Sequence, residues 1–188
     1  IGSPYSYLAA TQIDAVGKRT KTPVRWRPFL LGGVFKASGN TTPATVQSKA
    51  RWMLQDLTRW AEHYGVPFKM SSRFPLNTLR TQRALTGVAL KHDDAKVGVL
   101  AMQLFQAYWV NDQDISDEAV ITEVASHCGL DGAALLEMSG SQAVKDRLKS
   151  DTDEAVRRGA FGAPTVFIGD QMFWGNDRLL LVEAMLSQ

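Results

Sequence analysis

The two ends of the chain carry the residues whose types and spacing are best suited to chemistry. Ser3 stands directly before Pro4 and a run in which apolar residues recur with helical spacing, so we expect Ser3 to cap the start of a helix. A helix N-terminus offers unpaired backbone N–H groups and about half a positive charge, which stabilises anions and lowers the pKa of a thiol. Taken alone, a serine before a proline usually marks no more than the start of a helix.

The second candidate is Pro164, which is separated from the apolar run 166–168 by Thr165 alone. Gly169-Asp170 after that run predicts a hairpin turn, with 171–174 as the returning strand. A proline just before a buried strand requires an edge position, a first position or a cis peptide bond. In thioredoxin-like folds a cis-proline at this place lies opposite the helix N-terminus that carries the catalytic thiol. In those folds the residue before the cis-proline offers its backbone to a peptide-like ligand, and the corresponding residue here would be Ala163, facing Ser3.

The spacing at the start of the chain resembles the thioredoxin redox motif without its sulfurs. A thioredoxin carries Cys-x-x-Cys there, whereas this chain has Ser3-Pro4-Tyr5-Ser6. Thiol–disulfide exchange is therefore excluded at this position. A serine at the first position of this motif can instead donate a hydrogen bond to a thiol that belongs to a ligand.

Composition limits the partners of the chain. Its 188 residues, with 45% hydrophobic residues and a net charge of +2, suit one domain, or a domain with a large insertion. The charge does not suggest a nucleic-acid or membrane surface, and no apolar run approaches the ~20 residues of a membrane span. The single cysteine, Cys128, is expected to be a buried structural thiol, and with three histidines no metal cluster is evident. A reducing, cytoplasmic setting agrees with this cysteine usage.

These residues need elements that bring the two chain ends together. The first helix should run about a dozen residues from Pro4, followed by a short strand over 24–29, where apolar and charged residues alternate. A loop rich in Gly, Asn and Pro is expected from Gly32 to Pro43. The pattern predicts an α/β domain interrupted by a helical insertion. Further helices are expected over 44–64, 77–90, 94–109 (capped by Asp93-Asp94), 116–128, from Asp131 onward, 141–158 and 179–186.

Five motifs follow one another along the chain: Ser3-Pro4-Tyr5-Ser6-Tyr7-Leu8, Ser38-Gly39-Asn40, Trp60 to Pro67, Phe161 to Thr165 and Phe173 to Leu179. In this order they resemble the bacterial 2-hydroxychromene-2-carboxylate isomerases and, more distantly, the kappa-class glutathione transferases. The resemblance implies an α/β fold, a thioredoxin-like domain with a large, all-helical DsbA-like insertion. It assigns 1–32 and 159–188 to the thioredoxin-like domain and 33–158 to the insertion, with the first strand missing, as in a truncated chain.

The resemblance also implies roles for individual residues. Ser3 would be the catalytic serine, close to the sulfur of the cofactor glutathione. Ala163 would hold the cysteinyl backbone of glutathione beside cis-Pro164, although a larger aliphatic residue is usual at this position. The γ-glutamyl end would lie at a helix start, which can bind an ammonium and a carboxylate together. The residues implied for glutathione are Ser3, Asn40, Lys49, Ala163, Pro164, Trp174, Gly175, Asn176 and Asp177, and those implied for the substrate are Lys36, whose charge suits a carboxylate, and Phe74.

The implied function is a glutathione-dependent isomerisation in the degradation of aromatic, naphthalene-like compounds, with a small aromatic substrate as partner. Two alternatives stay open. A kappa-like transferase would conjugate glutathione to electrophiles; Lys49 and Ser38-Gly39-Asn40 favour it, whereas 174–177 favour the isomerase. A non-catalytic DsbA-like protein would bind peptides along the cis-proline edge. Family members are often dimers, so a homodimer is possible, but no segment identifies an interface.

Overall fold

Helices dominate the molecule because long stretches repeat apolar residues every three or four positions. The computed structural model describes residues 1–92 and 94–188. Two 3₁₀ turns, η1 (Pro43–Thr45) and η2 (Asn176–Arg178), and two strands, β1 (Thr165–Ile168) and β2 (Gln171–Trp174), accompany the helices. The helices of the described part are α1 (Pro4–Thr20), α2 (Leu31–Ser38), α3 (Gln47–Tyr64), α4 (Leu79–Lys91), α5 (Asp94–Trp109), α6 (Glu118–His127), α7 (Gly132–Ser139), α8 (Gln142–Arg157) and α9 (Leu179–Leu186).

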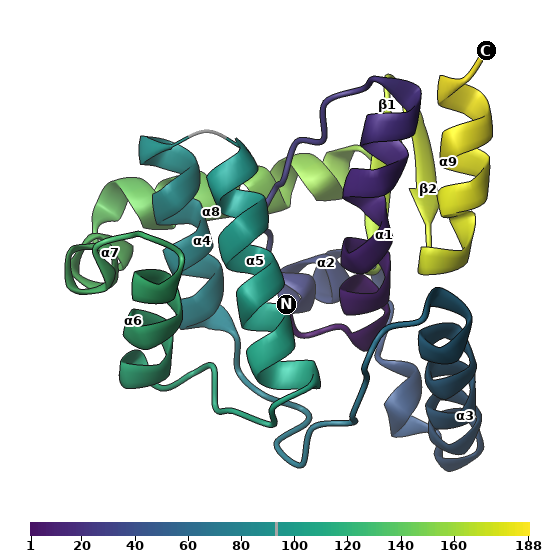
Figure 1. The fold of residues 1–188 in the computed structure, drawn as a ribbon, viewed down its shortest axis with the longest axis horizontal. Helices are drawn as coiled ribbons and strands as arrows, with labels where there is room; N and C mark the ends of the chain where they lie inside the picture. Colours follow the sequence, from purple (N-terminus) through teal and green to yellow (C-terminus); the bar gives the residue numbers. More distant parts are fainter. Residues whose placement is uncertain (93) are drawn as a thin grey trace.

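The two strands form the hairpin that the sequence predicts. β1 and β2 pair antiparallel, with Thr165 opposite Trp174 and Ile168 opposite Gln171. The turn between them is Gly169-Asp170. The purple helix α1 and the yellow helix α9 lie beside this hairpin, so the first and last helices of the chain are neighbours (Figure 1).

The main core lies between α1 and α5. Tyr7 and Leu8 of α1 are buried against Leu104 and Phe105 of α5 in one hydrophobic cluster. Each buried side chain of this size stabilises the fold by about 1.5–3 kcal/mol. The indole N–H of Trp109 at the end of α5 donates to the carbonyl of Ile1 at 3.1 Å. The start of α1 is therefore held against α5. The helices α4 and α6 pack against α5, and α7 packs against α4 and α6 (Figure 1).

The predicted helices between residues 44 and 158 are confirmed, with ends that differ by a few residues. The first helix is longer than expected, since it continues to Thr20. Asp117, Asp131 and Ser141 each accept a backbone N–H at the start of a helix. The predicted cap at Asp93 lies outside the described residues.

The predicted strand over 24–29 is wrong. This segment is not assigned as a strand, and among the residues that the structure describes its backbone forms no ladder with another segment. Alternating side chains make a strand only where a neighbour satisfies the backbone N–H and C=O groups. Trp26 instead packs against α5, where a Cβ at Gly98 would stand 2.6 Å from the indole nitrogen.

The predicted loop from Gly32 to Pro43 is also wrong over its first half, which forms α2. Val34 is fully buried, and α2 packs against α8. The backbone N–H of Leu30 donates to Thr152 Oγ1 of α8 at 3.0 Å. Tertiary burial thus overrides the poor helix propensity of two adjacent glycines, as it does for most short helices.

No helix in the described ranges is both long and apolar enough to cross a lipid bilayer. The same residues hold no group of three or more His, Cys, Asp or Glu side chains placed to bind a metal ion. Cys128 is half-buried at the end of α6. Burial raises the pKa of its thiol, which keeps the sulfur protonated.

Candidate functional site

Ser3 caps α1, as predicted. Its backbone is extended, and its Oγ accepts a hydrogen bond from the backbone N–H of Ser6 at 3.3 Å. The hydroxyl donates to the carbonyl of Ala163 at 3.0 Å, across 160 positions of sequence. Ser3 is only 8% exposed, and the first turn of α1 contains no acidic residue. No side chain of the first turn itself therefore compensates the positive end of the helix next to this hydroxyl.

Ala163 and Pro164 form the opposite wall of the site. The peptide bond between them is cis, as expected from the thioredoxin-like pattern. The carbonyl of Pro164 accepts the backbone N–H of Gly175 at 3.1 Å. The backbone N–H of Ala163 has no hydrogen-bond partner among residues 1–92 and 94–188. It can thus donate to the carbonyl of a peptide-like ligand that lies between Ser3 and the cis-proline.

The end of β2 and the segment after it supply an aromatic ring and polar groups beside this wall. Trp174 is 46% exposed, and its ring lies 4.9 Å from that of Phe161, centroid to centroid. Asn176 is buried, and its side-chain N–H₂ donates to the hydroxyl of Tyr64 at 3.4 Å. That hydroxyl donates in turn to the carbonyl of Asn176 at 3.2 Å. Asp177 is half-buried and forms an ion pair with Arg178 at 3.1 Å.

A tyrosine–aspartate contact that the sequence pattern did not reveal links α1 to α3. Tyr5 OH donates to Asp56 Oδ2 at 2.8 Å. Burial and this hydrogen bond raise the pKa of Tyr5, with smaller contributions from the charges of Asp56 and Asp177. Helical spacing marks Tyr5 and Tyr64 only as apolar positions, so their hydroxyl contacts could not be found that way. The one available signal was that both residues fall inside the family motifs.

The segment from α2 to α3 carries three further predicted residues. The side-chain N–H₂ of Asn40 donates to the carbonyl of Phe161 at 2.8 Å, which brings Asn40 to the loop that leads into Ala163. Lys36 and Lys49 are exposed, and in the part of the chain that the structure describes neither side chain forms an ion pair or a hydrogen bond. The structure therefore joins Asn40 to the group around Ser3 by contact, and it shows no such contact for the two lysines.

Phe74 lies on the loop before α4. Its ring is half-buried and stands 5.8 Å from the ring of Trp109, centroid to centroid. Trp109 binds the carbonyl of Ile1, two residues before Ser3. Phe74 is thus connected to the start of α1 through one side chain, without a direct contact to Ser3.

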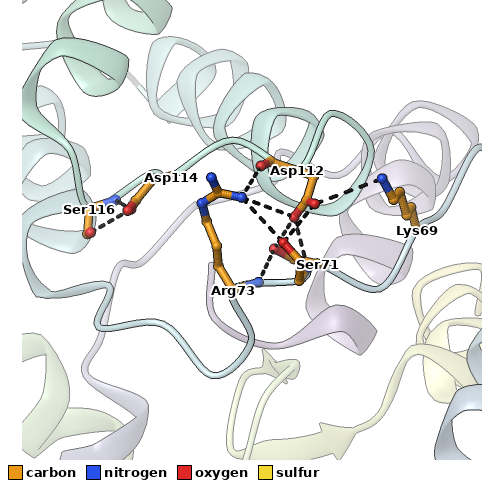
Figure 2. A network of polar contacts seen from close by, with 7 residues as sticks. Lys69, Ser71, Arg73, Asp112, Asp114 and Ser116 are labelled. Atoms are coloured by element: carbon orange, nitrogen blue, oxygen red, sulfur yellow. Dashed lines mark hydrogen bonds and ion pairs between the residues drawn. The ribbon is translucent and has the colours of Figure 1, made fainter.

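The polar network in Figure 2 fixes the loop that carries Phe74. The carboxylate of Asp112 accepts the hydroxyls of Ser71 and Ser72 at 2.8 and 2.9 Å and the backbone N–H of Ser72 at 2.9 Å. Lys69 and Arg73 form ion pairs with the same carboxylate at 3.9 and 3.7 Å. The guanidinium of Arg73 also donates to the carbonyl of Asp112 at 2.8 Å.

This network predicts a measurable titration. The Ser71 and Ser72 hydrogen bonds hold the pKa of Asp112 below its ordinary value of 3.8. A carboxyl group with a lowered pKa contributes stability above its ordinary pKa and loses it as pH falls through the lowered value. We expect the NMR amide signal of Ser72 to titrate with a midpoint below 3.8, and the transition to disappear in Asp112→Asn. A midpoint at or above the ordinary value would contradict this assignment.

A family model described as DSBA-like thioredoxin domain matches residues 1–187. Among the similar proteins, 2-hydroxychromene-2-carboxylate isomerase of Sphingobium xenophagum is 33% identical over 186 residues, which cover 98% of this chain and 93% of the relative. Glutathione S-transferase kappa 1 of Homo sapiens is 30% identical, with 99% of this chain and 87% of the relative covered.

Solved structures agree with the fold. A structure of 2-hydroxychromene-2-carboxylate isomerase superimposes with a TM-score of 0.88 at 28% identity, covering 98% of this chain and 89% of that chain. A probable DsbA oxidoreductase from Streptomyces coelicolor gives a TM-score of 0.76 at 19% identity, covering 100% and 85%, and shows the fold alone. The predicted DsbA-like thioredoxin fold is therefore confirmed.

Proposed function

The chain belongs to the DSBA-like thioredoxin domain family, and from that premise we propose that it is a glutathione-dependent isomerase of the 2-hydroxychromene-2-carboxylate isomerase type. Relatives named as isomerases and as kappa glutathione transferases support an enzymatic function within this group. The observation that carries the proposal is Ser3, whose buried hydroxyl lies at the N-terminus of α1 and contacts the residue before cis-Pro164.

Two parts of glutathione, its central cysteinyl residue and its γ-glutamyl end, find suitable groups among the described residues. The unpartnered N–H of Ala163 is suited to the carbonyl of the cysteinyl residue. The carboxylate of Asp177, at the start of η2, is suited to the γ-glutamyl ammonium. We assign Asn40, Trp174, Gly175 and Asn176 to the walls of this site, and Lys49 to a carboxylate of the tripeptide.

The part that Ser3 plays follows from its proton. In the structure the hydroxyl donates to the carbonyl of Ala163, and because a hydroxyl has one proton it can donate to one acceptor at a time. With a thiolate in the site, Ser3 would turn this proton toward the sulfur, while Ser6 N–H and the end of α1 add their partial charges. The combined effect lowers the pKa of the thiol and holds the sulfur in one position.

When bound, glutathione supplies a sulfur nucleophile that adds reversibly to a conjugated substrate and permits rotation about a former double bond. Lys36 would hold the substrate carboxylate by charge, since its ammonium is exposed and forms no ion pair within the described ranges. Phe74 would lie beside the aromatic ring of the substrate.

We further propose that the substrate comes from aromatic degradation in the cytoplasm. Residues 1–32 with 159–188 would form one lobe of the site, and residues 33–158 the other.

A kappa-like glutathione transferase is the second candidate. The hydrogen bond between Asn40 and the carbonyl of Phe161 favours it, because it ties a kappa-type position to the cis-proline loop. The two reactions differ in their use of the thiol, since a transferase consumes glutathione and an isomerase returns it.

The test is glutathione binding by calorimetry, followed by addition of 2-hydroxychromene-2-carboxylate while its absorbance and the free thiol are both measured. We expect binding, spectral interconversion and constant thiol. Conjugation of a chlorodinitrobenzene-type electrophile, with loss of thiol and no interconversion, would replace the isomerase by the transferase. A melting temperature that does not respond to glutathione well above millimolar concentration would leave only a peptide-binding DsbA relative.

A further inference from the structure

A cavity lies between α2, α4 and α8, and its lining includes none of the residues assigned to glutathione. Its volume is about 230 Å³. Three leucines, Leu30, Leu79 and Leu148, supply apolar walls, one from each side of the cavity. None of the residues assigned above to glutathione or to the substrate lines it. The cavity is therefore a separate feature that the proposed function leaves unused.

Basic side chains surround these apolar walls. Lys149 forms an ion pair with Asp153 at 2.6 Å, so those two charges neutralise each other. Arg83 of α4 and Lys145 of α8 also line the cavity, and within residues 1–92 and 94–188 neither side chain has an ion-pair or hydrogen-bond partner. Two uncompensated positive charges on different helices thus face the same apolar space.

The environment of Arg83 strengthens its attraction for an anion. This residue is half-buried, and Lys145 is exposed. A charge beside apolar walls is screened less than one in open water, so its attraction for an anion is stronger. A guanidinium also offers paired donors that match the two oxygens of a carboxylate. An anion with an apolar body would satisfy both kinds of lining at once, whereas an inorganic anion would leave the leucines in contact with water.

From this arrangement we propose that the cavity between α2, α4 and α8 binds a small amphipathic carboxylate, with Arg83 and Lys145 holding the carboxylate and the three leucines holding its apolar body. The volume is slightly below the roughly 300–1,000 Å³ of sites for larger ligands. It therefore favours a single-ring or short-chain acid over a polycyclic one. Binding at this site needs no glutathione, so it stands independently of the proposed function.

The test uses 2-hydroxybenzoate as the probe, added to the protein without glutathione. We expect NMR shifts of the Leu79 and Leu148 methyl groups on titration. Phenol, which has the ring without the carboxylate, and inorganic phosphate, which has the charge without the ring, should bind at least about tenfold more weakly. Shifts confined to residues near Ser3 would overturn the proposal, because they would place the probe in the glutathione site.

Charge-removing variants complete the test. Arg83→Gln and Lys145→Gln should each weaken probe binding about tenfold or more, as the loss of a hydrogen bond to a charged group does. Arg157→Gln is the matched control, because Arg157 is exposed on the same helix as Lys145 and does not line the cavity. An equal loss in Arg157→Gln would show unspecific attraction and overturn the site. Lys145 is exposed, so its variant keeps the test valid even if Arg83→Gln fails to fold.

Discussion

Replacement of Ser3 by alanine should lower the glutathione-dependent rate by about 10²–10³-fold, the usual effect of removing one positioned donor from a developing or bound anion. The Ser3 hydroxyl is the side-chain donor at the start of α1, and in the structure it already points across to Ala163. Without it, the thiol of bound glutathione should keep its proton to a higher pH. A titration of thiolate absorbance in the complex measures this shift directly.

The fold should survive this substitution. Ser3→Ala removes an N-cap, which costs about 0.5–2 kcal/mol of unfolding free energy, and it leaves the Ala163 carbonyl without its partner. Ser6→Ala is the control, because Ser6 contributes its backbone N–H, which alanine retains. We expect Ser6→Ala to keep both the rate and the thiol pKa. An unchanged thiolate titration in Ser3→Ala would refute the catalytic assignment of this serine.

Replacement of Gly175 by alanine should both destabilise the protein and weaken glutathione binding. Gly175 has φ 110° and ψ 151°, a region that residues with a Cβ rarely adopt, at a cost of about 1–3 kcal/mol. A Cβ at this position would stand only 2.4 Å from Asp177 Oδ1. The carboxylate assigned to the γ-glutamyl ammonium must therefore move. We expect the dissociation constant of glutathione to rise about tenfold or more, the loss expected for a hydrogen bond to a charged group.

Gly169→Ala separates the two effects. Gly169 also has a positive φ, 53°, but an added Cβ would meet no heavy atom within 4 Å. Its substitution should cost about 1–2 kcal/mol for the left-handed backbone and leave glutathione affinity unchanged. Thermal unfolding and calorimetry on both variants provide the comparison. Equal affinities in the two variants would rule out Asp177 as a glutathione contact.

Features that depend only on residues close together in the sequence could be predicted without a structure. The sequence predicts Ser3 as a helix cap and Asp131 as the start of a helix, and both accept a backbone N–H three residues ahead because a short polar side chain reaches it. The hairpin around Gly169-Asp170 follows from turn chemistry in the same way. The family motifs added the pairing of Ser3 with Ala163, which no local pattern contains because 160 positions separate them.

Other features depend on packing or hydrogen-bond partners from distant segments of the chain, and these are known only from the tertiary structure. Burial of Val34 against α8 makes a helix where two glycines predict a loop, and the absence of a ladder partner in the described chain leaves 24–29 without strand pairing. The Tyr5–Asp56 contact and the Asp112 network join separate segments through side chains whose spacing carries no signal. Helix propensities differ by up to about 1 kcal/mol per residue for glycine, whereas burying one large side chain contributes about 1.5–3 kcal/mol, so long-range packing prevails in α2.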